Sequence, residues 1–237
     1  LAYGNEIEKS SNHYFGFLEA LDVVCRTDRE DFTPIKISQI TGFIECMERK
    51  FESQPLADIV YFVDSSQRSF TSAVFLMGCC WIMMDNIHPN EFHHLFKKGS
   101  RTQNVRTPCK VEFSNGKTRL TIMDCWLPLW RAKSLRWIAM PNNKGIWGSI
   151  DPMEYDHYAH PLDADLSIVV PGRFVALKAP RDMTTHYLDT KDKGREFSPA
   201  YFVDIFKALG VTDVVQLNKA KYPTDPIEAA GIRHHDL

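Results

Sequence analysis

The chain has 237 residues, of which 44% are hydrophobic and 24% are charged, a composition typical of a folded protein with one large or two small domains. Its formal net charge of −2 at pH 7 provides no electrostatic argument for a nucleic-acid partner. The longest apolar stretch, residues 72–84, is shorter than the about 20 residues that a membrane-spanning helix needs. We therefore expect a buried helix there, and neither nucleic-acid binding nor membrane insertion.

The amino-terminal stretch LAYGNEIEKSSNHYF shows neither a secretory-signal pattern nor an initiator Met, so we expect the biological start to lie elsewhere. The six cysteines have no framework spacing, and most stand in apolar contexts such as MGCCW and MDCW. This usage predicts buried free thiols in a reducing, intracellular compartment.

Hydrophobic periodicity in the first part of the chain predicts helices and one apolar strand. The strand ADIVYFV, residues 57–63, is followed by a polar loop at residues 64–69. The predicted helices cover residues 34–51, 70–86, 89–98 and 118–137, the last one interrupted by Pro128.

The composition changes at the turn-rich segment PNNKGIWG, residues 141–148, which marks a domain boundary. Beyond it we expect a short acidic helix, a hairpin, a loop at residues 194–198 and then alternating strands and helices. The ranges are 151–160 for the acidic helix, 166–170 and 173–177 for the hairpin strands, 199–209 and 223–230 for helices, and 211–217 and 232–237 for strands. This alternation predicts an α/β fold with parallel pairing.

Metal binding is not the favoured interpretation of the histidine clusters. The neighbours in His93-His94 and in His234-His235 point to different faces of a helix or strand. His157 and His160 share a helical face, but neither a cysteine nor a third ligand was identified beside them in the sequence. We therefore expect neither a metal nor another cofactor.

The loop DSSQRSF is predicted to lie between a strand and the start of a helix. In that position the backbone N–H groups of a loop and a helix start can bind an anion. Its residues are Asp64, Ser65, Ser66, Gln67 and Arg68. The loop contains neither Cys nor Gly, so it offers neither a thiol nucleophile nor much backbone freedom. A solvated connector in which Asp64 or Ser66 caps the helix is therefore favoured over an anion site. The chain also lacks the Gly-rich and Gly-x-Ser-x-Gly motifs of nucleotide-binding proteins and serine hydrolases.

A third group of candidate residues is acidic: Glu154, Asp156, Asp163 and Asp165, close to Asp151. The residues allow two interpretations. One is a solvated helix with an acidic first turn, which composition favours. The other is a groove that binds a basic peptide.

Several tracts resemble the mitotic-exit dual-specificity phosphatases, the family of cell division cycle protein fourteen. The strongest are YDHY (residues 155–158), DADLSIVVPGRFVAL (163–177), VTDVVQLNKAKY (211–222) and AAGIRHHDL (229–237). QRSFTSAVFLMG (67–78) and LTIMDC (120–125) match more loosely.

The resemblance implies two phosphatase-like α/β domains in tandem, each with a central, mostly parallel sheet flanked by helices. Residues 1–148 would form the amino-terminal domain, with Asp64 to Arg68 at its degenerate loop. Residues 149–162 would form a linker helix, and residues 163–237 the start of a truncated catalytic domain.

The resemblance also implies a chemistry. In this family a Cys thiolate of a His-Cys-x-x-x-x-x-Arg loop attacks phosphorus, the Arg stabilises the transferring group, and an Asp protonates the leaving oxygen. We expect these residues beyond Leu237, so this chain carries no catalytic residue and is expected to be inactive alone.

Substrate recognition in the family uses an acidic groove between the domains, which accepts phosphoserine-proline sites with nearby basic residues. Asp156 and Asp165 match acidic positions, and Glu154 is a weaker candidate. Ala159 and Ser167 stand where an acidic and an amide residue are expected, so the groove is diluted.

The resulting prediction is a cell-cycle hydrolase acting on phosphoproteins during mitosis and cell division. Its expected location is the nucleus or cytoplasm, including the centrosome, the spindle or the cilium. The alternative is a non-catalytic pseudophosphatase that serves as a scaffold in a cytoskeletal or ciliary assembly, with a partner covering the open second domain. A Cys-x-x-x-x-x-Arg loop beyond Leu237 would distinguish the two.

Overall fold

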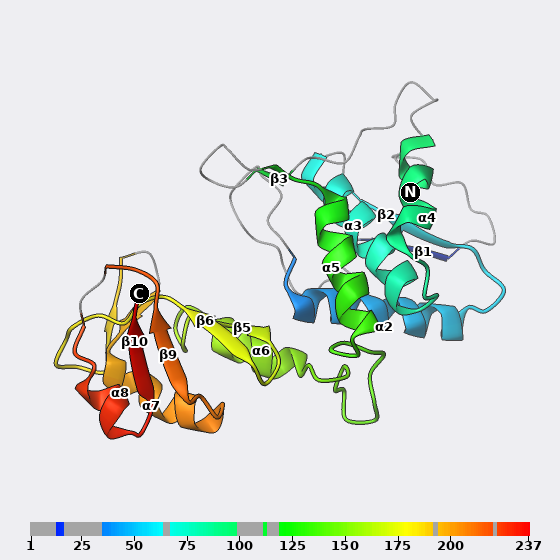
Figure 1. Cartoon of the computed structure of the whole chain (residues 1–237). Helices are drawn as coiled ribbons and strands as arrows, with labels where there is room; N and C mark the ends of the chain where they lie inside the picture. Colours follow the sequence, from blue (N-terminus) through cyan, green and yellow to red (C-terminus); the bar gives the residue numbers. More distant parts are fainter. Residues whose placement is uncertain are drawn as a thin grey trace. The chain divides into compact units, whose positions relative to one another are not determined.

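The computed structural model divides the chain into two compact units, Leu1–Pro152 and Met153–Leu237 (Figure 1). It describes residues 13–16, 35–63, 67–98, 111–112, 119–191, 194–219 and 222–237. Among these, the description of residues 13–16, 67–68, 95–98, 111–112 and 119–120 is limited to the backbone. The division falls inside the segment that the sequence suggests as a linker.

The first unit is mainly helical, as the periodicity predicts. Its helices are α2 (Ile37–Ser53), α3 (Gln67–Met83), α4 (Pro89–Lys98) and α5 (Ile122–Ser134). Helix α5 is shorter than predicted and runs through Pro128 without a break. It starts at a capping box in which Asp124 N–H donates to Thr121 Oγ1 at 3.4 Å and Thr121 N–H donates to Asp124 Oδ2 at 2.7 Å.

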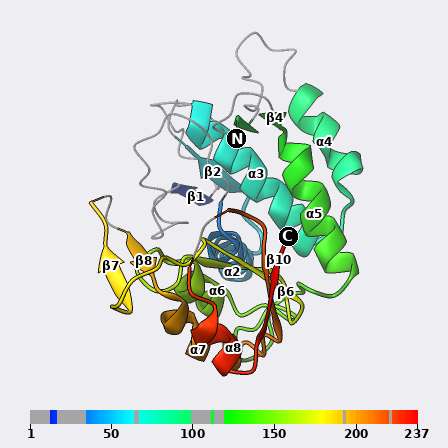
Figure 2. The ribbon, with the colours of Figure 1, turned by 60° about the vertical axis from the view of Figure 1, so that its left-hand side comes forward.

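Helix α3 forms the centre of the first core, because its sequence is apolar on every face and it packs against α2, α4 and α5 (Figure 2). Ala73, Val74 and Leu76 are fully buried. Trp126 of α5 donates its indole N–H to the carbonyl oxygen of Phe75 at 2.9 Å, so α5 is tied to α3 by a buried hydrogen bond.

The strands of the first unit occur in pairs. β1 (His13–Gly16) and β2 (Ile59–Phe62) are parallel, with His13 opposite Ile59. β3 (Val111–Glu112) and β4 (Arg119–Leu120) are antiparallel.

The second unit begins with α6 (Pro152–Ala159), whose first residue closes the first unit, and continues with two antiparallel hairpins. β5 (Leu166–Val170) and β6 (Phe174–Leu177) form the expected hairpin, with Leu166 opposite Leu177. β7 (Tyr187–Asp189) and β8 (Arg195–Phe197) form the other. The prediction of a loop at residues 194–198 is therefore wrong, because residues 195–197 pair with residues 187–189.

The carboxyl-terminal part of the second unit is a strand-helix-strand element. α7 (Pro199–Ala208) leads into β9 (Asp213–Gln216), then α8 (Asp225–Ala229), then β10 (Arg233–Asp236). β9 and β10 are parallel and α8 makes the crossover, which confirms the predicted parallel pairing at this end.

The fold is mixed α/β, as predicted, but its strands are paired rather than gathered into one broad sheet. Within the described residues they form five two-stranded sheets, two of them parallel and three antiparallel. The core of the second unit lies among α7, α8 and the β5–β6 hairpin. It contains Ala164, Leu166, Phe197, Phe202, Phe206, Ile227 and Ile232. In the described part of the chain, no helix combines the length and apolar character required to cross a membrane.

Candidate functional site

The strand and the helix on either side of the predicted degenerate loop are confirmed. β2 ends at Phe62 and α3 begins at Gln67. The prediction that Gln67, Arg68 and Ser69 belong to the loop is therefore wrong, because these residues form the first turn of the helix. Asp64, Ser65 and Ser66 lie outside the described residues, and so do the side chains of Gln67 and Arg68.

The described cysteines of the first unit are buried or half-buried thiols, as predicted. Cys46, Cys79 and Cys80 are buried, and Cys125 is partly exposed. Desolvation raises the pKa of Cys79 and of Cys80. The neighbouring thiols raise the pKa of Cys79 further, and Asp85, followed by Cys46, raises that of Cys80. A nucleophilic cysteine needs the opposite shift, so neither thiol is suited to attack a phosphate.

One Cys-x-x-x-x-x-Arg spacing does occur in the sequence, at Cys125 and Arg131 (CWLPLWR). Both residues lie in the continuous helix α5, whose interior N–H groups are used by the helix itself. Burial, and then Asp124, raise the pKa of the Cys125 thiol. This segment therefore cannot wrap its backbone N–H groups around a phosphate, and the spacing here belongs to a packing helix.

The acidic candidates lie at the start of the second unit. Glu154 and Asp156 are on α6, and Asp165 stands at the end of the turn that leads into β5. Asp165 is exposed and has a φ of 49°, in the left-handed region that Asp tolerates better than most residues. Its backbone N–H donates to the carbonyl oxygen of His160 at 3.2 Å, which closes the turn.

The turn from His160 to Asp165 is held by side chains from two other elements. Tyr201 of α7 donates its hydroxyl to the carbonyl oxygen of Asp163. Arg195 of β8 donates a hydrogen bond from Nη1 to the carbonyl oxygen of Leu162 at 2.9 Å. Its backbone N–H donates to the carbonyl oxygen of Pro161 at 3.1 Å. The position of Asp165 is therefore fixed by α7 and by the β7–β8 hairpin.

The structure brings Asp163 to His157 of α6 and to His160, which directly follows that helix. Its Oδ2 lies 3.5 Å from His157 Nδ1 and 3.6 Å from His160 Nδ1. The regular spacing of His157, His160 and Asp163, three residues apart each time, is the sequence signal for this arrangement, although Asp163 was not expected beside the histidines. The described residues contain no group of three or more His, Cys, Asp or Glu residues that could hold a metal ion.

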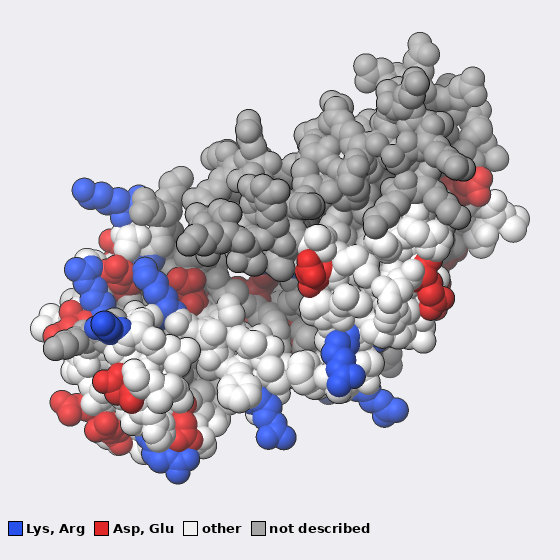
Figure 3. All heavy atoms as spheres, turned by 45° about the horizontal axis from the view of Figure 1, so that its top comes forward, with Lys and Arg blue, Asp and Glu red and all other residues white. Residues whose placement is uncertain are grey.

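Basic side chains lie next to Asp165. Asp165, Lys178, Arg181 and Arg195 line the same small cavity of about 30 Å³. Arg181 is paired with Glu196, and Arg195 Nε donates to Asp189 Oδ1 at 2.7 Å. On the face drawn in Figure 3, acidic and basic side chains of the second unit are interspersed rather than separated by sign. Asp165 therefore stands in a mixed field, which weakens its attraction for a cation.

Tyr155, the first tyrosine of the YDHY tract, is half-buried. The hydroxyl oxygen of Tyr155 is buried and forms no hydrogen bond within the described part of the chain. Burial, and then the charge of Glu154, raise the pKa of Tyr155 to about 12. The phenol therefore remains protonated at neutral pH and acts as a packing group of α6.

Comparison with known proteins identifies the class. Residues 3–132 match the family described as dual specificity protein phosphatase, N-terminal half, so the chain belongs to this family. The match covers the four helices α2 to α5 almost completely, and ends inside α5.

Similarity to individual relatives extends through the second unit. The chain is 25% identical over 241 residues to the dual specificity protein phosphatase CDC14C of Homo sapiens, covering 100% of this chain and 50% of the relative. It is 25% identical to CDC14C of Symphalangus syndactylus, covering 100% and 46%. It is 28% identical over 233 residues to human CDC14A, covering 96% and 36%. The chain thus spans half or less of the length of these relatives.

Proposed function

We propose that this chain is the amino-terminal portion of a dual-specificity protein phosphatase that acts on phosphoserine-proline sites in proteins. The observation that supports it is the similarity to CDC14 phosphatases, which runs through both units rather than through the matched family region alone. The reaction would proceed through a cysteine-phosphate intermediate, with the Cys, Arg and Asp in sequence that follows Leu237.

The role proposed for this chain is to support the catalytic domain and to recognise the substrate, rather than to catalyse the reaction. The first unit would be the phosphatase-like domain without catalytic residues. Residues 64–68 would stand at its degenerate loop position, where Gln67 and Arg68 open α3. Residues 149–162 would link the two domains. The parallel pair β9–β10 would belong to the catalytic sheet, because active-site loops follow the carboxyl ends of parallel strands. Phosphoproteins are the proposed substrates, and the proposed locations are the nucleus, cytoplasm, centrosome, spindle or cilium.

Substrate recognition is proposed to use Asp156 and Asp165, with a smaller contribution from Glu154. Carboxylates at these positions would attract a basic residue beyond the phosphoserine-proline pair. The half-buried Ala159 and the exposed Ser167 contribute no charge, and Lys178 and Arg181 lie beside Asp165, so we expect a modest preference.

The test compares two proteins on one phosphopeptide. The first protein is the 237-residue chain, and the second is a longer natural protein that contains it, identified by an intact mass above 27.3 kDa. Both are assayed on a phosphoserine-proline peptide. We expect turnover by the longer protein and none by the chain. Phosphate release by the longer protein that does not depend on any cysteine would overturn the proposal.

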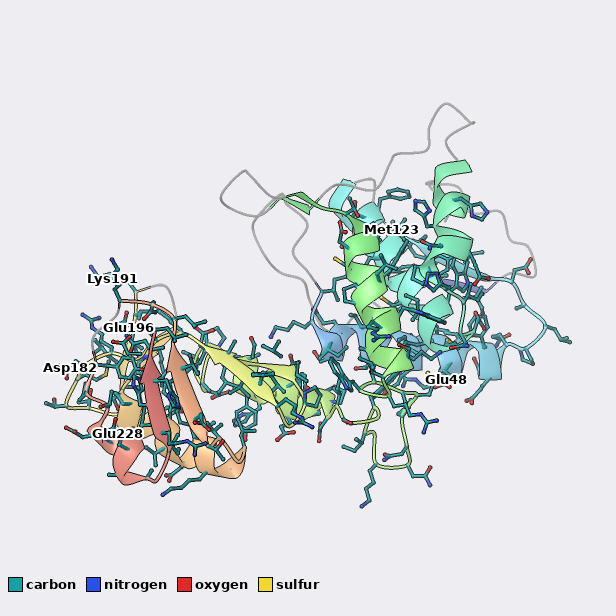
Figure 4. All side chains as sticks on the ribbon, in the orientation of Figure 1. Glu48, Met123, Asp182, Lys191, Glu196 and Glu228 are labelled. Atoms are coloured by element: carbon teal, nitrogen blue, oxygen red, sulfur yellow. The ribbon has the colours of Figure 1, made fainter. Side chains whose placement is uncertain are left out.

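The acidic residues are tested by substitution in the longer protein. Asp165→Asn keeps the left-handed backbone, because Asn tolerates it as well as Asp does. Combined with Asp156→Asn, it should lower kcat/KM about three- to tenfold for a peptide with a basic residue and leave the matched alanine peptide unchanged. Asp182→Asn, an exposed substitution at the margin of the second unit (Figure 4), is the control. An equal loss on both peptides would reject these residues as the basic-residue site.

A non-catalytic scaffold is the second candidate, and exposed apolar side chains favour it. Val215 of β9 is 51% exposed, and Leu217 just after it is 82% exposed. Such surfaces attract a covering partner. A longer protein with no Cys-x-x-x-x-x-Arg loop after Leu237 would establish the scaffold in place of the enzyme.

A further inference from the structure

A groove of about 280 Å³ lies between α6 and α7 in the second unit. Glu154, Asp156 and Asp165 are not among the residues that line it. Helix α6 contributes His157 and Tyr158, and helix α7 contributes Tyr201 and Asp204. The volume is slightly below the range of about 300–1,000 Å³ that is typical of small-molecule sites.

Two carboxylates face this groove. Asp204 is exposed, and it makes no hydrogen bond or ion pair with the residues that the structure describes. Asp163 lies 3.5 Å from His157 Nδ1, which is too far for a short charge-assisted hydrogen bond. Both carboxylates therefore keep acceptor capacity for a ligand.

Two aromatic rings flank the carboxylates. The Tyr201 ring stacks on Phe197 with centroids 4.5 Å apart, and its hydroxyl is fixed on the carbonyl oxygen of Asp163. Tyr158 packs partly against the hydrophobic core. These rings are held by the fold before any ligand arrives, so little conformational entropy is lost on binding. His186 and the apolar Ala164, Ala200 and Ile205 complete the lining.

We propose that this groove binds the guanidinium group of an arginine in a peptide segment. The planar guanidinium donates to carboxylates in pairs and stacks on tyrosine faces, and the arginine methylenes suit the apolar lining. Lysine offers a point charge without the planar face and would bind more weakly. Two carboxylates disfavour an anion.

The inference does not depend on the proposed phosphatase activity. It uses other side chains than the proposed acidic site, and it requires neither a phosphate nor the catalytic loop. The two ideas therefore fail separately, since the groove is tested on the 237-residue chain with a ligand that carries no phosphate.

The experiment titrates the isotope-labelled chain with N-acetyl-arginine amide and follows backbone amide resonances. N-acetyl-citrulline amide is the matched control, because it has nearly the same shape but no charge. We expect resonances of Ala200, Tyr201 and Asp204 to shift with a Kd of about 1–10 mM for arginine. Citrulline should bind at least about fivefold more weakly, because charge-assisted hydrogen bonds are lost. Equal affinity for the two compounds overturns the proposal.

Two variants locate the site. Asp204→Asn removes one carboxylate from an exposed helical position and should weaken arginine binding about fivefold or more. Asp182→Asn, outside the groove, should leave it unchanged. Ala200→Leu fills the groove without changing charge and should abolish binding. Unchanged binding by Asp204→Asn and Ala200→Leu, with both proteins folded by their spectra, would show that arginine binds elsewhere and overturn the assignment.

Discussion

Asp213 and Arg233, the first residues of the parallel strands β9 and β10, form a two-pronged ion pair. Arg233 Nε and Nη2 donate to the two carboxylate oxygens of Asp213, each at 2.7 Å. Thr212 Oγ1 donates to the same carboxylate at 2.8 Å, and His235 Nε2 lies 2.9 Å from it. Asp213 therefore fixes the register in which the two strands pair.

This pair predicts loss of stability in acid. The hydrogen bonds from Arg233, then His235 and Thr212, hold the pKa of Asp213 well below its usual range. A depressed folded-state pKa stabilises the fold above the unfolded pKa, about 3.9 for Asp, and this contribution is lost as the pH falls below it. We expect Asp213→Asn to unfold at a lower temperature than the parent at pH 6 and to show a smaller drop in Tm between pH 6 and pH 3. Parallel Tm curves for the parent and the variant would contradict this role.

A second prediction concerns the contact between α3 and α5. A Cβ on Gly78 would stand 2.2 Å from Trp126 Cε2, in the buried layer where the indole is also held by Phe75. Gly78→Ala should therefore destabilise the first unit by about 1–3 kcal/mol in urea unfolding, although alanine is the better helix former. Gly42→Ala in α2 is the matched control, because its Cβ meets nothing within 4 Å. Equal effects at the two glycines would show that the indole moves aside without cost.

A third prediction concerns the end of α3. Lys133 of α5 donates Nζ to the carbonyl oxygens of Ile82 at 2.6 Å and Met83 at 3.0 Å, and so satisfies groups that have no partner within the helix. Lys133→Met should cost about 1–3 kcal/mol of unfolding free energy, because these carbonyls lose their donor. Lys144→Met, at an exposed position, should change stability little. If both substitutions leave the urea midpoint unchanged, water replaces the lysine fully.

A fourth prediction concerns the turn before β5. Tyr201→Phe removes the hydroxyl that binds the carbonyl oxygen of Asp163 but keeps the ring in its stack on Phe197. We expect faster amide hydrogen exchange across residues 161–165 and a stability loss of about 1 kcal/mol. Tyr187→Phe, on an exposed strand, serves as the control. Unaltered exchange in the turn would mean that the Arg195 contacts suffice to hold it.

The elements that the sequence predicted well are those with long, regular hydrophobic patterns. Helix α2 follows from apolar residues at helical spacing, α3 from a continuous apolar stretch, and α4 from the proline and glycine at its ends. The βαβ element at the end of the chain follows from alternating strands and helices. The pair β7–β8 could not be found in this way. Its strands have three residues each and its pairing is supported by Arg195 with Asp189, so no apolar alternation marks it.

The site was less predictable than the fold, because it depends on contacts between distant residues. Asp156 and Asp165 were identified from a resemblance, and their role stays a prediction. The tie between Tyr201 and Asp163 spans 38 positions in the chain, and no local pattern announces it. Pro128 predicted an interruption that α5 does not show, because packing of α5 on α3 keeps the helix intact.

The backbone of Asp165 limits how this position can evolve. A φ of 49° is tolerated by Gly, Asn and Asp, but a longer or branched side chain strains it. Glutamate would keep the negative charge and pay a conformational penalty, while Asn and Gly would keep the turn and lose the charge. Among acidic residues, only aspartate satisfies both requirements here. Relatives that abandon an acidic residue at this position should therefore drift to Asn or Gly first, and keep the turn long after the charge has gone.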